Sequence, residues 1–141
     1  MSLSQLSSYF EFPVTVYYED TDAGGVVYHS NYLNFFERAR TELLRSKGVN
    51  QRVLLEEHTG FVVRHMDIDF IRGARLDDQL TVKTYIEEFK KASLTFAQEI
   101  VDQQDVTIAK ALVKVACIDN VKMKPKAIPS SILVELKHSD G

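Results

Sequence analysis

Apolar residues recur at helical spacing in one long stretch of the chain and at every second position in most of the rest. Between residues 32 and 43 the apolar stripe consists of Tyr32, Phe35, Phe36, Ala39 and Leu43. This spacing lines one face of an α-helix. Ser30 or Asn31 can cap its start, and Gly48 can adopt the positive φ that ends a helix. We therefore expect one long helix of roughly 15 residues, about 23 Å in length.

Charged residues fill the other faces of this expected helix, and they are Glu37, Arg38, Arg40, Glu42 and Arg45. Arg38 and Glu42 are four residues apart, which allows them to pair. A shorter helix is expected at residues 51–57, with Val53 and Leu54 facing inward.

The rest of the chain has the two-residue alternation of β-strands. Strands are expected at residues 12–18, 61–72, 79–89, 92–102 and 106–118. In the second of them, Val62, Met66, Ile68 and Phe70 fall on one face, and His65, Asp67 and Asp69 on the other. The last strand is apolar on both faces, which is typical of a strand that is buried on both.

One long helix followed by strands joined by short turns predicts an α+β fold, in which an antiparallel sheet of five strands wraps around the helix. Residues 1–141 are expected to form a single domain, with a loose leader at 1–11 and a short C-terminal helix at 129–136. The outer face of the sheet is partly apolar, and no second long helix is expected to cover it. That face predicts self-association.

Composition narrows the classes of function. A chain of 141 residues with 45% hydrophobic and 26% charged residues is typical of one soluble globular domain. Its net charge of −3 provides no general attraction to nucleic acid or anionic membrane. The single cysteine, Cys117, excludes an internal disulfide and a metal site built from several thiolates. Because no apolar run is long enough to span a bilayer and the N-terminus does not resemble a signal peptide, we expect no transmembrane segment and a cytoplasmic location.

The loop before the long helix carries the candidate chemistry. Asp20 and Asp22 are followed by Gly24 and Gly25, which allow a ligand to approach the backbone closely. Unpaired N–H groups in the first turn of the helix point back toward this loop. A carboxylate near such donors can attack a carbonyl and stabilise the oxyanion that forms. From the residues alone, Asp22 can equally be a turn residue that bonds its own backbone, and Asp20 is interpreted as an Asx-turn residue.

The run DTDAGGVVYHSNYLNFFERAR, residues 20–40, resembles the signature of hotdog-fold thioesterases in the 4-hydroxybenzoyl-CoA thioesterase branch. It is most similar to the YbgC type, the acyl-CoA thioesterases associated with the Tol–Pal gene cluster. The resemblance extends from about Phe12 to Leu136. It implies a hotdog fold and hydrolysis of an acyl-CoA thioester to free acid and CoA. No metal or prosthetic group is implied, since CoA enters as part of the substrate. It also implies a homo-oligomer, a dimer paired edge to edge that commonly forms a tetramer, with active sites at the subunit boundary.

The same resemblance implies roles for individual residues. Asp22 matches the catalytic carboxylate, acting as nucleophile or general base, and main-chain N–H groups around Tyr28 to Ser30 match the oxyanion donors. His29 lies beside the site in YbgC-type proteins; it either orients the substrate carbonyl or a water, or is simply a polar residue near solvent. Tyr28 belongs either to the core or to the pocket wall. The candidate catalytic residues are thus Asp22, His29 and Tyr28, and the candidate substrate-binding residues are Gly24, Gly25, Val27, Ser30 and Asn31.

Two other functions are compatible with the fold. A hotdog hydratase or dehydratase typically needs a differently placed Asp–His or His–Glu pair, which we do not find. A non-catalytic module that binds acyl carrier protein is the main alternative. The chain has no G-x-S-x-G motif, which argues against an α/β-hydrolase esterase.

For two further groups of polar residues, a functional role and a simple solvent-exposed role are both open. His65, Asp67 and Asp69 are more typical of a solvated sheet face or dimer contact than of a metal site. The basic residues at strand ends either contact the phosphates of CoA or lie in ordinary solvated turns; they are Arg72, Arg75, Lys90 and Lys91.

Overall fold

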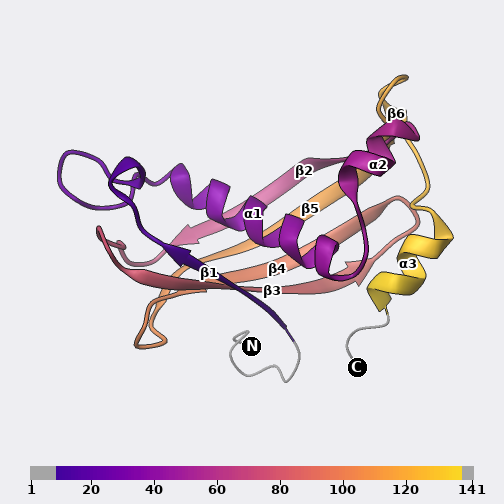
Figure 1. The fold of residues 1–141 in the computed structure, drawn as a ribbon. Helices are drawn as coiled ribbons and strands as arrows, with labels where there is room; N and C mark the ends of the chain where they lie inside the picture. Colours follow the sequence, from indigo (N-terminus) through magenta and orange to yellow (C-terminus); the bar gives the residue numbers. More distant parts are fainter. Residues whose placement is uncertain (1–8, 138–141) are drawn as a thin grey trace.

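A long helix lies across one face of a curved antiparallel sheet (Figure 1). This computed structural model describes residues 9–137. The main elements are α1 (Asn31–Ser46), β1 (Phe10–Thr15), β2 (Thr59–Phe70), β3 (Gln79–Phe89), β4 (Ser93–Val101) and β5 (Thr107–Asp119). The short elements are η2 (Tyr18–Asp20), α2 (Gln51–Glu56), β6 (Lys124–Pro125) and α3 (Ser130–Lys137). Within residues 9–137, no helix has both the length and the apolar character needed to cross a bilayer.

The sheet has the strand order β1-β3-β4-β5-β2, every neighbouring pair is antiparallel, and the short β6 pairs with β5. β1 and β2 are therefore the two edges of the sheet. The predicted α+β class, with five antiparallel strands and one long helix, is confirmed, and the two-residue β6 is an additional strand that was not predicted.

The core lies between α1 and the inner face of the sheet. All residues of the predicted stripe are buried, and Phe35, Phe36 and Ala39 are fully enclosed. Facing them are the inner residues of β4 and β5, among which Phe96 and Val113 are at most 1% exposed. Each large apolar side chain buried in this way contributes about 1.5–3 kcal/mol, so this stripe is what holds the helix on the sheet.

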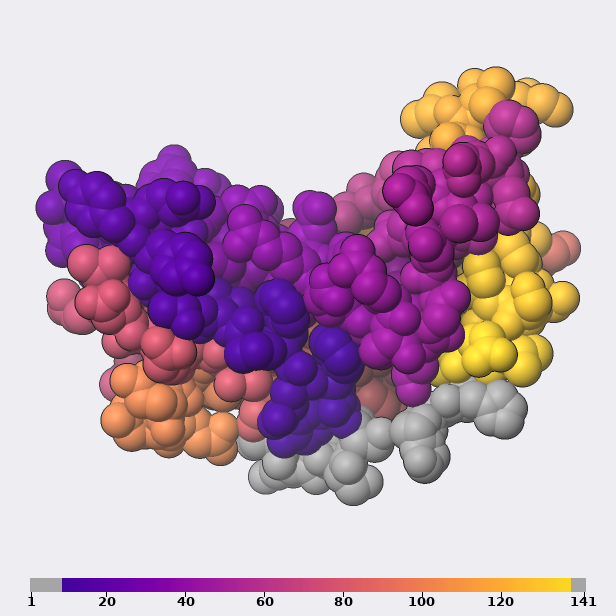
Figure 2. Space-filling view, viewed as in Figure 1, coloured from indigo at the N-terminus to yellow at the C-terminus, as the bar shows by residue number. Residues whose placement is uncertain are grey.

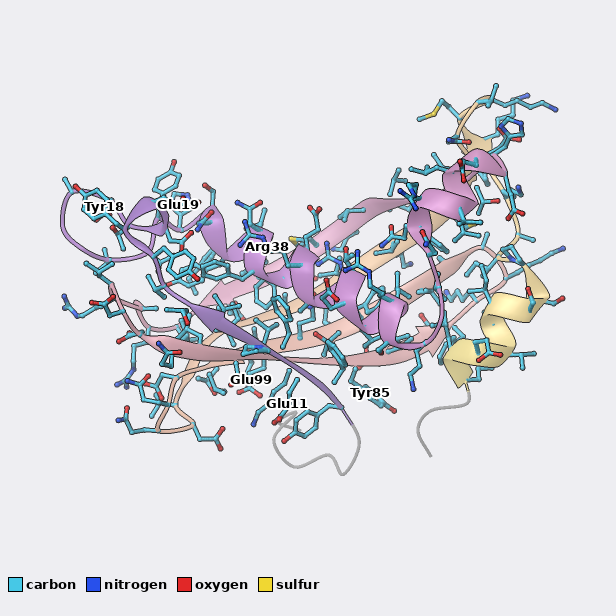
Figure 3. All side chains as sticks on the ribbon, in the orientation of Figure 1. Glu11, Tyr18, Glu19, Arg38, Tyr85 and Glu99 are labelled. Carbon is cyan, nitrogen blue, oxygen red and sulfur yellow. The ribbon has the colours of Figure 1, made fainter. Side chains whose placement is uncertain are left out.

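Three expectations about α1 are wrong. Ser30 precedes the helix but its side chain makes no capping hydrogen bond. Glu42 pairs with Arg45, one turn further along, at 2.6 Å. Arg40 does not lie on an outer face, because its side chain turns toward the sheet and is 7% exposed. Arg38, by contrast, is exposed and projects from the side of α1 that faces away from the sheet (Figure 3).

The N-terminal boundaries also differ from prediction. β1 begins at Phe10, so the last residues assigned to the loose leader, 10 and 11, belong to the strand, while residues 1–8 lie outside the described part of the chain. β1 ends at Thr15, and residues 18–20 form a turn of 3₁₀ helix rather than the end of the strand. The C-terminal helix is found within one residue of the predicted bounds.

A β-bulge changes the faces of β2. Val63 lies opposite Val115 but His65 lies opposite Lys114, so Arg64 is an extra residue between them. Because side chains alternate along a strand, one extra residue reverses the faces. Val62 is therefore on the outer face, 40% exposed, and the prediction that it shares a face with Met66 is wrong.

Two other burial predictions are wrong. Val53 in α2 is 43% exposed, whereas Leu54 beside it is buried as expected. Leu112, on the outer face of β5, is also 43% exposed, so β5 is not buried on both faces in the single chain. The outer face also carries a row of alternating charges through consecutive strand partners, which are Glu11, Lys83, Glu99, Lys110 and Asp69. Opposite charges in such directly opposed positions stabilise a sheet.

Candidate active site

The loop before α1 is a tight hairpin. Thr21 and Val27 form a bridge, the Asp22 N–H donates to the carbonyl of Val26 at 2.9 Å, and the Gly25 N–H donates to the carbonyl of Asp22 at 3.0 Å. Gly25 has φ +78°, a conformation that favours glycine. A Cβ on Gly24 would lie 3.3 Å from Oδ1 of Asp22. Both glycines therefore allow the chain to fold closely around the Asp22 carboxylate.

The two aspartates of the loop have opposite surroundings. Asp20 is 6% exposed, and its carboxylate accepts hydrogen bonds from the Tyr17 N–H at 2.8 Å and from Nδ2 of Asn31 at 2.6 Å. The prediction of a simple Asx-turn at Asp20 is therefore wrong, since its side chain fastens the loop to the start of α1. Asp22 is exposed. Its Oδ1 accepts from Gly24 N–H at 2.8 Å, while its Oδ2 accepts no hydrogen bond from any described residue.

The amides at the start of α1 differ in their partners. The Tyr28 N–H donates to the carbonyl of Asp20 at 3.1 Å, so it is not available as an oxyanion donor as the resemblance implied. The N–H groups of Asn31 and Tyr32 donate to carbonyls of the preceding turn. Across residues 9–137, no acceptor is found for the N–H groups of His29 and Ser30. The unpaired donors next to the Asp22 hairpin are thus His29 and Ser30.

The exposed ring of His29 lies near two aromatic rings. Its ring centroid lies 4.7 Å from that of Tyr28 and 6.0 Å from that of Phe70, at the end of β2. Phe70 also contacts Tyr32 at 5.9 Å. The Tyr32 hydroxyl accepts from the Ala74 N–H at 2.9 Å, and burial raises the pKa of Tyr32. Tyr28 is 53% exposed, so it belongs to the surface of the site rather than to the core.

Phe70 is the site residue that sequence reasoning did not identify. The alternation of the sequence places it only on one strand face with Met66 and Ile68, whereas in the structure it is 49% exposed and contacts His29. Its position at the end of a strand is visible in the sequence. That this strand end meets the start of α1 depends on the strand order, for which a single sequence contains no signal.

The remaining candidates are placed as follows. Asn31 holds Asp20 and accepts from Nδ2 of Asn34 at 2.7 Å. Ser30 and Gly24 are exposed and Gly25 is half-buried. Val27 is 5% exposed and packs in the core, so its side chain does not reach the surface of the loop. Its N–H donates to the carbonyl of Ala74 at 2.9 Å, which docks the hairpin on the β2–β3 connection.

Three of the polar residues that had two interpretations lie near charged or polar neighbours. His65 and Asp67 pair at 3.4 Å on the exposed outer face, and the described residues contain no cluster suited to a metal ion. Lys90 lies 3.9 Å from Glu88. Burial raises the pKa of Cys117, which keeps its thiol protonated and unreactive.

Residues 16–136 match the family model described as the Thioesterase-like superfamily. The chain belongs to this superfamily. Among its curated relatives, it is 51% identical to the acyl-CoA thioesterase YbgC of Haemophilus influenzae over 134 residues, which cover 94% of this chain and 98% of the relative. It is 50% identical to the acyl-CoA thioester hydrolase YbgC of Escherichia coli over 128 residues, covering 91% and 96%. A solved structure of a probable thioesterase from Bartonella henselae has a TM-score of 0.81 at 40% identity, over 86% of this chain and 100% of that one.

These comparisons confirm the resemblance to YbgC-type thioesterases and, together with the sheet wrapped around α1, the hotdog fold. In this thioesterase-like chain, the hairpin and the start of α1 are joined by the hydrogen bond between Asp20 and Asn31. The arrangement presents a carboxylate oxygen and main-chain donors, which are the groups that thioester hydrolysis requires.

Proposed function

We propose that this chain hydrolyses acyl-CoA thioesters to free acid and CoA, with Asp22 as the catalytic carboxylate. The reaction class is supported by relatives that are named acyl-CoA thioesterases and match almost the whole chain. The observation that carries the assignment of residues is that Oδ2 of Asp22 is free on the hairpin that leads into α1, and that the amides of His29 and Ser30, which follow this hairpin, are unpaired among the described residues.

The thioester carbonyl would sit with its oxygen against the amides of His29 and Ser30. These donors lie at the positive end of the α1 dipole, which favours the negative charge that develops on the oxygen. Asp22 then acts in one of two ways. It displaces the CoA thiolate to form a mixed anhydride that water cleaves, or it removes a proton from a water that attacks the carbonyl directly. His29, whose ring contacts those of Tyr28 and Phe70, would orient the carbonyl or the water.

Single-turnover hydrolysis in H₂¹⁸O distinguishes the two routes. If Asp22 is the nucleophile and water cleaves the anhydride at the aspartyl carbonyl, ¹⁸O enters the Asp22 carboxylate, whereas a general base places ¹⁸O directly in the product acid. Neither route requires a metal or prosthetic group, so we expect a chelator to leave turnover unchanged. Wild-type protein that releases no thiol from a panel of acyl-CoAs would contradict the proposed function.

We also propose that the protein works as a dimer joined through β2. This strand has 12 residues, lies at an edge of the sheet, and presents exposed apolar side chains at Val62, Val63 and Phe70. A long edge strand with unpaired backbone groups and exposed apolar side chains favours association. Pairing with a second copy satisfies the backbone groups and covers the apolar side chains. Two such dimers could then join through the outer sheet face, where Tyr85 and Leu112 are exposed. Sedimentation of wild type and of Val63→Lys tests the edge contact, because a lysine there should favour the monomer.

We further propose a cytoplasmic location, where acyl-CoA is available, and acyl carrier protein as a second acyl donor, because it carries the same phosphopantetheine arm as CoA. Comparing kcat/KM for the same acyl group on CoA and on acyl carrier protein decides which donor is preferred. Tight binding of acyl carrier protein without any thiol release would favour the non-catalytic alternative.

A further inference from the structure

The bulge in β2 restricts how two copies of this edge strand can pair. Before the bulge, Phe61 faces inward opposite Cys117; after it, Met66 and Ile68 face inward opposite Val113 and Ala111. In an antiparallel pair, directly opposed side chains share a face. The register that pairs β2 along its full length places Phe61 opposite Ile68 of the second copy, so inward residues meet inward residues. Phe70 of each copy then lies opposite Thr59 of the other.

This register brings unlike ends of the two copies together. Phe70 belongs to the aromatic cluster with His29, next to the Asp22 hairpin. At the opposite end, the start of β2 adjoins α2 and the β5–β6 turn (Figure 1), and Thr59 lies opposite Asp119 of β5. Neighbouring strands lie about 4.8 Å apart. The α2 end of one copy therefore lies beside the candidate active site of the other.

That end of β2 contains a hollow of about 240 Å³ between α2 and the β5–β6 turn. Its lining is mainly apolar and includes Leu54, Leu55, Val62 and Met123. The turn projects beyond α2 on the surface (gold in Figure 2), and Met123 in it is 69% exposed. Hydrogen bonds from the Val121 and Lys122 N–H groups to Oδ1 of Asp119, both at 2.9 Å, hold the turn in shape.

One buried polar atom in this lining has no hydrogen-bond partner among the described residues. Oδ1 of Asn120 is buried, and it receives no hydrogen bond from any residue that the structure describes. Buried acceptors without a donor are rare in folded proteins. Among residues 9–137, the hydrogen bond found for Asn120 runs from its main-chain N–H to the carbonyl of His58 at 3.4 Å. Because Asn120 lines the hollow, an N–H group of a ligand that enters it could donate to this acceptor.

We propose that this hollow in each protomer receives the pantetheine arm of an acyl-CoA whose thioester lies in the Asp22 site of the second copy, and that Asn120 accepts a hydrogen bond from an amide N–H of that arm. The inference rests on the proposed function. The arm alternates short apolar segments with two secondary amides, which matches an apolar hollow with one unsatisfied acceptor. Asn120 is a positioning residue, since it would hold the substrate without touching the reacting atoms.

Two esters of one acyl group test the role of Asn120. With Asn120→Ala, we expect kcat/KM for the acyl-CoA to fall about 10-fold, mainly through KM, because one hydrogen bond to the substrate is lost. The ester of ethanethiol has no pantetheine arm, and its loss should stay within about 2-fold. Gln104→Ala, in the exposed β4–β5 turn, is the matched control and should alter neither ester. Equal losses on the two esters, or no loss on acyl-CoA, would overturn the proposal.

Mixed dimers test whether the arm crosses between copies. A protomer with Asp22→Asn is paired with a protomer carrying Asn120→Ala, using two affinity tags. If the sites are shared, one site combines the intact Asp22 with the intact Asn120, so the mixed dimer keeps about half of the wild-type rate with the wild-type KM. If each site belongs to one chain, the mixed dimer shows the raised KM of Asn120→Ala, and the proposal fails.

The outcomes separate this inference from the function on which it rests. Wild-type protein that hydrolyses neither ester refutes the thioesterase proposal itself. If the wild type is active but Asn120→Ala loses the same fraction of kcat/KM on both esters, only the proposed pantetheine contact is refuted. Thermal unfolding of Asn120→Ala should match wild type, because the buried Oδ1 that it removes accepts no hydrogen bond from the described residues.

Discussion

The start of α1 and the region beneath its middle both gather polar groups, but with opposite results. Beneath the middle, Arg40 donates to Oε1 of Gln98 at 3.0 Å, and Nε2 of Gln98 donates to the carbonyl of Phe36 and to Oγ1 of Thr84, each at 3.0 Å. At the start, Oδ2 of Asp22 and two main-chain amides have no partner among residues 9–137. Satisfied polar groups in a core hold the helix to the sheet, whereas unpaired groups at a surface are available to a ligand.

The strongest way to test this comparison is Asp22→Asn. An asparagine retains the Oδ1 acceptor for the Gly24 N–H, so the hairpin should keep its shape. It is neither a nucleophile nor a base, and thiol release should fall by about 10³-fold, while the urea midpoint should stay at the wild-type value. Glu19→Gln, an exposed carboxylate in the same loop (Figure 3), is the control and should remain active. Turnover of Asp22→Asn within about 10-fold of wild type would remove Asp22 from the mechanism.

Beneath the middle of α1, where the polar groups are paired, Gln98→Leu should lower the stability of the fold rather than the rate of thiol release. Leucine leaves the buried guanidinium of Arg40 without its acceptor, and we expect a loss of about 3 kcal/mol in the free energy of unfolding. Urea denaturation measures this loss. Gln103→Leu, in the exposed β4–β5 turn, should cost little. Adding Arg40→Met to Gln98→Leu should recover part of the loss, because it removes the unpaired charge. A cost below about 1 kcal/mol would show that this network does not hold the helix.

Asp20→Asn tests the boundary between the two regions. The Asp20 carboxylate accepts from both Tyr17 and Asn31, and an amide cannot accept from both sides. We expect a loss of about 1–2 kcal/mol in unfolding free energy. Asn31→Ala should have a similar effect, and the double variant should cost less than the sum, because both changes remove one contact. Fully additive losses would mean that the two side chains act independently.

The smallest effect is expected at the surface of α1. The ion pair between Glu42 and Arg45 is 2.6 Å long, but the two side chains are 36% and 67% exposed. Glu42→Gln should therefore change the unfolding free energy by no more than about 0.5 kcal/mol, measured by thermal or urea unfolding. A larger cost would indicate that polar groups on the surface of α1, and not only the network beneath it, contribute substantially to the free energy of unfolding.

Local patterns account for the parts of the fold that the sequence predicted. The stripe from Tyr32 to Leu43 depends only on spacing along one helix, and all of it is buried. β3 begins and ends at the predicted residues. The position of Val62 was missed because a bulge adds one residue without any mark in the local alternation. Arg40 was placed at the surface because a charged residue usually stays there, and only its contact with Gln98, 58 residues away, reverses that expectation.

By itself, the sequence determined the helix, the strands, the family and the candidate carboxylate, because periodicity and short motifs act between neighbouring residues. Only the tertiary structure decided which groups remain unpaired. Asp20 and Asp22 are two residues apart, yet one is enclosed by Asn31 and the other retains a free oxygen. Hydrogen-bond partners come from segments that the strand order brings together, so the availability of a donor or acceptor is a property of the folded chain.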